Sequence, residues 1–253
     1  MPHTGDILPS GRYAVVSCHV ERPLDDEVWR RFSALQEQRP GGFRIAALIR
    51  PPDATAGEDE RFWLERAREA AARGPLGLHT HWTAPDHARP TPTGGDPAAR
   101  VRREGRWLAE RGLEPTLFCG GGWYIDAEVA AVIAELGYAD CTATAFRPSY
   151  LAADAPRLTA RQPAWIHLPT GRRLLELPTT HSIGMLARGL LAPFRGPVVH
   201  AYFHDTDLLH PRRRLALVSA LRFLGLKRLP TDLGELQRRF RPEKTMSFAN
   251  SRG

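Results

Sequence analysis

Cysteine is scarce in this 253-residue chain, which has only Cys18, Cys119 and Cys141. Their wide spacing and the absence of a Cys-x-x-Cys pair argue against a disulfide framework and favour a reducing compartment. No apolar run approaches the roughly 18 residues that a membrane helix needs, and the N-terminus lacks a basic segment followed by a long apolar one. We therefore expect a soluble, cytoplasmic protein without a membrane span.

Lysine is nearly missing as well, because Lys227 and Lys244 are the only two and the other 33 of the 35 basic residues are arginines. The net charge is +7 and the pI about 9.9. The arginines are spread over several predicted helices, with no interleaved aromatic platform of the kind that binds single-stranded nucleic acid. Abundant Ala, Gly and Pro point to a GC-rich coding bias, so we predict no nucleic-acid partner.

The standard nucleotide-binding loops are also lacking. The stretch "CGGGW" at 119–123 follows a predicted strand, but it has neither the G-x-G-x-x-G spacing nor a Gly-Lys-Ser/Thr sequence. Its glycines, residues 120 to 122, allow the backbone to approach a ligand closely or to make a tight turn, and the sequence does not separate these alternatives.

What the sequence does contain is a regular alternation of short β-rich runs and amphipathic helical patterns. In chain order the pattern predicts strand 13–21, helix 25–38, strand 43–49, helix 57–73, strand 75–81, helix 96–112, strand 115–119, helix 126–136 and strand 138–143. A hairpin around Thr170 and Gly171 comes next, followed by strand 197–203, helix 211–224, strand 226–229 and helix 231–239.

This alternation is typical of a parallel sheet with crossover helices, so the predicted fold class is α/β. With 42% hydrophobic residues and no linker, the chain can form one domain over residues 13–240, between an N-terminal extension, 1–12, and a loose C-terminal tail, 241–253. About six to eight βα units closing into a single barrel is the simplest architecture, and a doubly wound open sheet is the alternative.

Imidazole and carboxylate side chains gather where three of these predicted strands end. The residues are His19 and Glu21 on the first strand, His79 and His81 on the third, and His200, Tyr202 and His204, followed by Asp205, on a late strand. Residues two apart on a strand point to the same face, and the functional rim of a βα barrel lies at the carboxyl ends of its strands. This pattern favours a site for a divalent metal, with Zn²⁺ as the first choice and Co²⁺, Mn²⁺ or Ni²⁺ as alternatives.

Several segments, in order, resemble motifs of the polysaccharide deacetylase family, also called the NodB-homology group. These are "GLHTHW", "FCGGGWYIDAEVAAVIAELGY", "LLELPTTH", "YFHDTDLL" and "LKRLPTDLGEL", and the resemblance spans roughly residues 13 to 240. It implies a distorted (β/α) barrel of about seven parallel strands. It also implies a divalent metal, an aspartate base, a histidine acid, and removal of an N-acetyl group from a carbohydrate or sugar-containing intermediate.

The first motif is degenerate. The family's T-F-D-D-G-P, aligned on Pro23, places Glu21 at the metal-binding aspartate and Val20 at the base, while another register places His19 at the first aspartate. Either alignment keeps Glu21 as a carboxylate, with a surface ion pair to Arg22 or Arg50 as the alternative role. Glu21 or His19 would then replace the base.

The second motif, His-Ser/Thr-x-x-His, begins at His79, but Thr83 stands where its second histidine belongs. His81 is the preferred substitute because its spacing needs no ordered loop, and His87 is the weaker alternative. The predicted metal-binding residues are therefore Glu21, His79, His81 and His19.

The last motif assigns the general acid to His204, beside Asp205, with His181 and His167 as alternatives. The family's base-orienting arginine is missing from "FCGGGWY", which is consistent with the lost base. The predicted substrate-binding residues, including aromatic rings expected to be exposed for stacking on sugars, are Trp82, Gly121, Gly122, Trp123, Tyr124 and His181. Two functions follow: a metal-dependent N-deacetylase acting on a carbohydrate or other small-molecule substrate, or a catalytically altered relative that acts as a glycan-binding or interaction module. The sequence makes no prediction of the oligomeric state.

Overall fold

The computed structural model describes residues 11–83, 95–146, 156–189 and 196–248. Its helices are α1 (Asp26–Gln38), α2 (Glu60–Arg73), α3 (Pro97–Glu110), α4 (Ala127–Leu136), α5 (Ile183–Gly189), α6 (Pro211–Lys227) and α7 (Leu233–Arg239). Its strands are β1 (Tyr13–Val20), β2 (Ala46–Ile49), β3 (Leu76–Thr80), β4 (Leu117–Gly120), β5 (Ala139–Asp140), β6 (Ala164–His167), β7 (Arg173–Glu176), β8 (His181–Ser182), β9 (Val198–His204), β10 (Leu229–Pro230) and β11 (Thr245–Ser247).

Strand β1 forms the middle of the sheet and is buried along its whole length. Its alternate side chains enter two different apolar clusters: Val16 and Val20 pack with residues of the helices, while Tyr13 and Val15 pack with Leu48 and others on the opposite face. A strand covered on both faces needs a nearly continuous apolar run, which "YAVVSCHV" provides, with Ser17 and His19 as its two buried polar residues.

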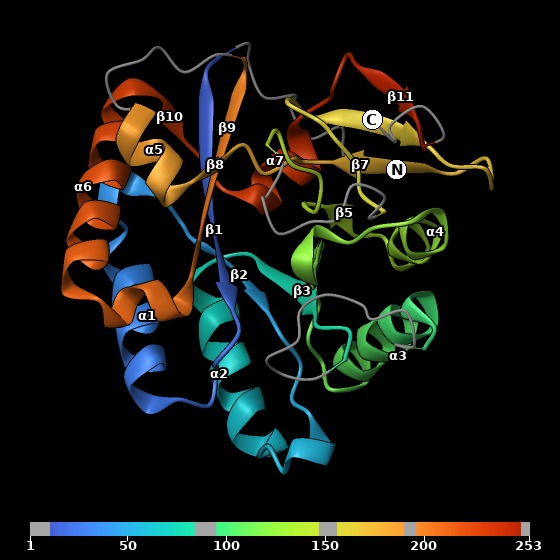
Figure 1. Ribbon diagram of the computed structural model, residues 1–253, viewed down its shortest axis with the longest axis horizontal. Helices are drawn as coiled ribbons and strands as arrows, with labels where there is room; N and C mark the ends of the chain where they lie inside the picture. The colour runs from blue at the N-terminus through green and yellow to red at the C-terminus, as the bar shows by residue number, and fades with distance from the viewer. Residues whose placement is uncertain (1–10, 84–94, 147–155, 190–195, 249–253) are drawn as a thin grey trace, which may run out of the picture.

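The sheet is mostly parallel, as the alternation of strands and helices predicts, and its order is β11-β6-β7-β5-β4-β3-β2-β1-β9-β8, with β10 beside β1. It contains more strands than the predicted seven or so, because the antiparallel pair β6–β7 and the short strands β8, β10 and β11 add to the parallel set. Figure 1 shows α1, α2 and α6 grouped near β1 and β2, and α3 beside α4 near β3.

One segment links two distant parts of this order. Directly after β7, the amide of Leu177 donates to the carbonyl of Asp140 at 2.7 Å, and three residues later Thr180 donates to the carbonyl of His200 at 2.9 Å. The segment therefore bonds to the end of β5 on one side and to β9 on the other. The arrangement is barrel-like, and complete closure of the barrel stays a prediction.

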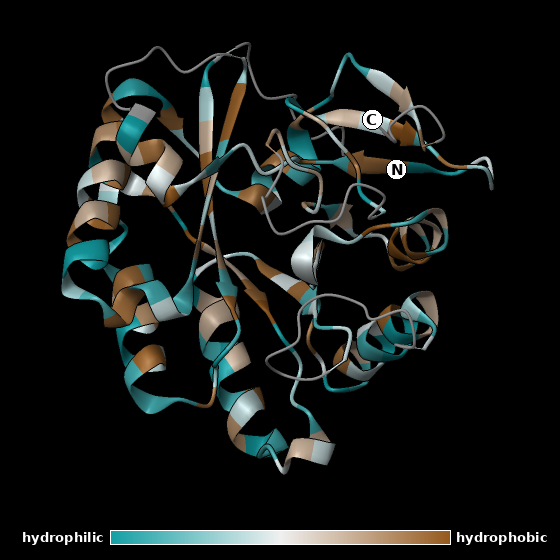
Figure 2. Cartoon of the chain, in the orientation of Figure 1, coloured by the Kyte–Doolittle hydropathy of each residue, from teal (hydrophilic) through white to brown (hydrophobic). Residues whose placement is uncertain are grey.

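Aspartate residues begin most of the described helices. At α1, α2, α3, α4 and α7 an aspartate side chain accepts a hydrogen bond from a backbone amide of the first turn, and these residues are Asp25, Asp59, Asp96, Asp126 and Asp232. Such caps satisfy amides that have no partner within the helix. The helices then bury one apolar side against the sheet, and Figure 2 shows their hydrophilic residues on the outside.

The C-terminal segment departs from expectation. Residues Thr245–Ser247 form β11, which pairs in parallel with β6 over Trp165 to His167, so the expectation of a loose tail is wrong for this part of it. The hairpin expected around Gly171 is present as β6 and β7. No helix in the described ranges is long and apolar enough to cross a membrane.

Two carboxyl groups face each other inside the fold without a basic partner. Asp140 on β5 and Glu176 on β7 are register partners, and both are fully buried. Asp140 Oδ1 accepts from the amide and hydroxyl of Thr142, whereas the carboxyl of Glu176 faces that of Asp140. Burial, and then the charge of Asp140, raise the pKa of Glu176 well above its ordinary value, and burial also raises that of Asp140.

A carboxyl whose pKa is raised by folding takes up a proton when the chain folds, so stability is lost as the pH rises above the unfolded value of about 4.3. Glu176→Gln supplies an uncharged amide that can donate to Asp140. We expect the variant to exceed the wild type in free energy of unfolding by about 1–3 kcal/mol at pH 8, with the difference shrinking towards pH 4.

Urea unfolding across that pH range measures this effect. Glu128→Gln, at an exposed position on α4, is the matched control and should leave the pH dependence of the wild type unchanged. Equal pH dependence in wild type and Glu176→Gln would contradict the buried, protonated pair.

Candidate metal centre

The register of the sheet brings the predicted residues to one level. Val20 is the register partner of Ile49, and Ile49 in turn is the partner of Leu78. The next residues, Glu21 after β1 and His79 in β3, therefore lie at the same level along the strand direction. On the other side of β1, His19 is the partner of His204 at the end of β9.

One carboxylate oxygen is the focus of the site. Glu21 Oε1 lies 3.4 Å from His81 Nε2, 3.6 Å from His79 Nε2 and 3.7 Å from His204 Nε2. Glu21, His79 and His81 each offer a donor atom within 4.8 Å of the other two. Atoms that bind one zinc ion at about 2.0–2.2 Å lie roughly 3–4 Å apart, so these contacts have the required scale.

The orientation of His79 suits a metal ligand. Its Nδ1 lies 2.8 Å from the carbonyl oxygen of Cys119, which accepts the ring hydrogen, and its Nε2 is buried without a hydrogen bond. Burial lowers the pKa of His79, which favours the neutral ring with a lone pair on Nε2. Metal-bound histidines commonly donate their second nitrogen to a carbonyl in this way.

This lone pair points at a carboxylate, which is unfavourable unless a positive charge lies between them. A divalent cation satisfies both donors at once, and two histidines with one glutamate form a known catalytic zinc set that leaves a coordination position open. The residues present thus fit a metal ion.

The backbone that carries Glu21 is held from two sides. Arg50 donates from Nε to the carbonyl of Glu21 at 3.1 Å, and its guanidinium is paired with Glu58 at 2.6 Å. Arg50 therefore contacts the backbone of Glu21 and not its carboxylate. Sequence reasoning considered Arg50 only as a surface partner, whereas it is 4% exposed.

Asp205 supplies the second support. Its carboxylate accepts from the amide of Arg22 at 2.8 Å and from the amide of Thr206 at 2.8 Å, and so joins the end of β1 to the end of β9. Burial raises the pKa of Asp205 to about 7. These contacts place Asp205 beside the backbone that carries Glu21 and His204.

His19 lies one layer below the glutamate. Its ring packs against that of His79, with the ring centroids 4.5 Å apart and the planes tilted by 33°, and its Nε2 is 3.6 Å from the thiol of Cys119. His19, His79 and Cys119 make a second group of neighbouring donor atoms, which shares His79 with the group that contains Glu21. Deeper still, His200 is hydrogen-bonded to Ser17 at 2.8 Å.

The aromatic residues near the site are mostly internal. Trp82 is 2% exposed and donates to the carbonyl of Gly121, and Trp123 is 5% exposed, so the expectation of exposed stacking rings is wrong for both. Tyr124 is half-buried, and its hydroxyl donates to Asp126.

The glycine run makes a tight turn. Gly121 to Trp123 form a 3₁₀ turn, with Gly122 at φ 61° and Trp123 itself at φ 63°, a backbone region that disfavours tryptophan. A Cβ on Gly120 would lie 2.1 Å from the carbonyl oxygen of Tyr124. The turn directs the Trp123 ring against His19 and Tyr202, at 5.4 and 4.9 Å.

The remaining predicted residues are dispersed. His181 belongs to β8, opposite Ala201, and its Nδ1 lies 2.8 Å from the hydroxyl of Thr180. His167 is exposed on β6. His87 lies outside the described residues.

Solvent reaches the site from one side. The side chains of His79 and His81 are each 2% exposed, whereas those of Glu21 and His204 are 26% and 38% exposed. A substrate can therefore approach over Glu21 and His204, while the two buried histidines lie behind.

Comparison with known proteins places the fold. No protein-family model and no curated protein sequence match the chain. A 4-alpha-glucanotransferase from Thermococcus litoralis matches in structure with a TM-score of 0.59 at 12% identity, over 94% of this chain and 42% of that one. The chain shares the fold of that part. It spans less than half of the glucanotransferase's length.

Two deacetylase structures also match, more distantly. A family 4 carbohydrate esterase from Streptomyces lividans has a TM-score of 0.44 at 12% identity, over 87% of this chain and 88% of that one. A putative polysaccharide deacetylase involved in O-antigen biosynthesis from Bordetella bronchiseptica has a TM-score of 0.45 at 16% identity, over 96% and 89%.

Asp205→Asn tests the support of the site. The amide nitrogen of asparagine cannot accept from a backbone amide, so one of the two hydrogen bonds to Arg22 and Thr206 is lost. We expect zinc affinity, measured by competition with a chromophoric chelator, to fall about 10–100-fold. Asp59→Asn, which alters only the cap of α2, is the control. Unchanged affinity in Asp205→Asn would show that the contact does not support the site.

Proposed function

We propose that this protein is a metal-dependent hydrolase that removes an N-acetyl group from a carbohydrate or sugar-containing intermediate. The observation that carries the proposal is the convergence of Glu21, His79 and His81, with a buried, unbonded Nε2 of His79 directed at the glutamate. The resemblance of "GLHTHW" and "YFHDTDLL" to deacetylase motifs supports the reaction type. The fold shared with a carbohydrate-processing enzyme is compatible with it.

Glu21, His79 and His81 would hold the ion, preferably Zn²⁺, with Co²⁺, Mn²⁺ or Ni²⁺ as alternatives. When bound, such an ion polarises the amide carbonyl and lowers the pKa of a water molecule towards neutrality. The part of the reaction assigned to the chain is proton movement. His204 has its Nε2 near Glu21 and a side chain that solvent reaches, so it is placed to give a proton to the departing amine.

The other predicted residues support this centre. Asp205 positions Glu21 and His204 through the backbone, since both of its oxygens accept backbone hydrogen bonds. His19 supports the ring of His79 from below. The tight turn of Gly121, Gly122 and Trp123 holds the Trp123 ring against His19. Tyr124 and His181 are assigned to contacts with more distant parts of a substrate.

Metal analysis is the first test. Protein purified without added metal and then reconstituted with Zn²⁺ should retain one ion per chain. His79→Ala and His81→Ala should each weaken zinc binding by more than about 100-fold, because each removes a ligand. His210→Ala, at an exposed histidine before α6, is the control and should bind like the wild type. Wild-type protein that retains no ion would refute the proposal.

His204→Ala separates proton donation from metal binding. The variant should keep zinc within a few-fold of the wild type but release acetate from N-acetylglucosamine oligomers about 10²–10⁴-fold more slowly in kcat. Loss of zinc from this variant would instead make His204 a ligand. Saturable oligomer binding by zinc-loaded wild type without acetate release would favour the glycan-binding alternative.

A further inference from the structure

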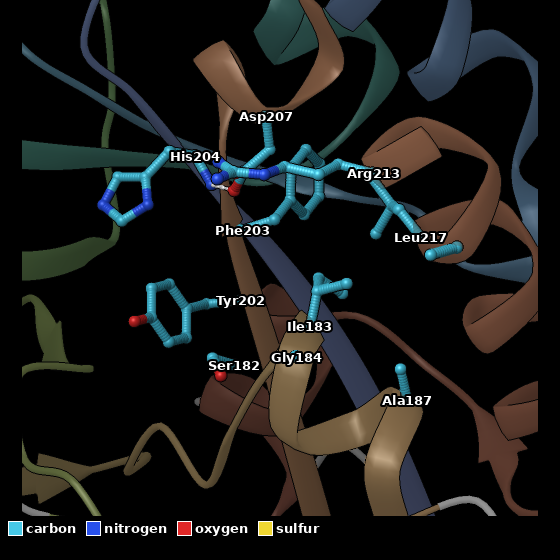
Figure 3. A pocket seen from close by; sticks show the side chains of 11 residues that line it. Ser182, Ile183, Gly184, Ala187, Tyr202, Phe203, His204, Asp207, Arg213 and Leu217 are labelled. Carbon is cyan, nitrogen blue, oxygen red and sulfur yellow. Dashed lines mark hydrogen bonds and ion pairs between the residues drawn. The ribbon is translucent and has the colours of Figure 1, made fainter. Parts of the chain in front are cut away.

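A cavity lies beside the end of β9, and His204 of the candidate centre is one of its lining residues. It has a volume of about 330 Å³ and is enclosed by the end of β9, by α5 and by α6. Its walls are mainly apolar and include Ile183, Ala187, Phe203, Ala216 and Leu217. Figure 3 shows Phe203, Ile183 and Leu217 on one side of β9, with the rings of Tyr202 and His204 directed to the other side.

The cavity and the candidate centre have one residue in common, His204 at the end of β9. The last register pair of β8 and β9 is Ser182 with Tyr202, after which the chain turns away into α5. Strand β9 continues to His204 without a strand partner on that edge among the described residues. His204 is one of the residues that line the cavity, while its ring lies on the other side of β9, with Nε2 3.7 Å from Glu21 Oε1, so the cavity and the centre adjoin this residue from opposite sides.

The chemistry of the lining favours an apolar occupant. Its charged members, Asp207 and Arg213, are paired with each other at 2.9 Å, and the Arg213 side chain is 66% exposed at the rim. Asp207 also accepts from the backbone amide of His204, so its oxygens are engaged. Of the other polar members, Ser182 Oγ accepts from the amide of Met185, and the rings of Tyr202 and His204 are directed away from this wall. A sugar ring needs several polar partners, whereas a hydrocarbon chain needs none.

The cavity is too large to be filled by an acetyl group alone. An apolar protein cavity of about 150 Å³ accommodates benzene, so a cavity about twice as large has room for a chain of roughly six to eight carbons. An acetyl methyl held near Glu21 would leave most of this space unfilled.

We propose that this cavity binds the acyl chain of the substrate, so that the enzyme accepts N-acyl groups of roughly four to eight carbons in addition to acetyl. This inference rests on the proposed hydrolase function, because the carbonyl must sit at the Glu21 centre. The chain then passes His204 through the gap between the ends of β8 and β9 and lies against Phe203 and Leu217.

Alkyl hydroxamates test the inference by binding alone, because the hydroxamate group anchors on zinc and the chain probes the cavity. Calorimetric titration of zinc-loaded protein with aceto-, butyro- and hexanohydroxamate should show the Kd falling about two- to fourfold for each added methylene. Ala187→Phe and Ala216→Phe fill opposite walls of the cavity at exposed positions. Both should abolish that gain and leave the Kd of acetohydroxamate within about twofold, whereas Ala71→Phe, exposed on α2, should retain it.

The outcomes separate the two claims. If acetohydroxamate binds but longer chains bind no more tightly, the acyl cavity is refuted and the metal centre stands. A chain-length gain that survives in both cavity-filling variants also refutes it, because the chain then lies elsewhere. If zinc is retained with no hydroxamate binding, or not retained at all, the proposed function fails and this inference falls with it.

Discussion

The candidate centre depends on one electrostatic constraint, which is that the carboxylate of Glu21 faces imidazole nitrogens that are removed from water. His79 cannot turn away, because its other nitrogen is hydrogen-bonded to the carbonyl of Cys119 and its ring packs against that of His19. A buried lone pair next to a carboxylate costs free energy unless a cation lies between them. Two hydrogen bonds hold the backbone of the glutamate in this position. Arg50 donates to the carbonyl of Glu21, and the amide of Arg22 donates to Asp205.

Much of the fold could be predicted from the sequence, since local pattern and composition determine it. Strand 13–21 and helix 126–136 lie within a residue of β1 and α4, because a continuous apolar run and a helix starting at Asp126 are unambiguous signals. Strand β11 was missed because its three residues alternate weakly, and it forms only by pairing with β6. The strand count was underestimated for the same reason.

The site shows the same division. His79 and His81 could be predicted to share one face, because their spacing is a local property of a strand. The supporting contacts could not: Asp205 reaches Arg22 across most of the chain, and nothing near either residue indicates this pairing. The burial of Trp82 and Trp123 was equally hidden, because a loop tryptophan has the same sequence signal whether it covers the surface or fills the interior.

The pairing of β1 with β9 also has a consequence for how the protein matures. His19 and His204 are adjacent across these strands, although they stand near opposite ends of the chain. A nascent chain on the ribosome exposes Glu21, His79 and His81 long before β9 emerges, and β1 lacks one of its two long neighbours until then. Such distant pairings form late and slow folding. His204 therefore reaches its place beside Glu21 only after β9 has been synthesised and has paired with β1.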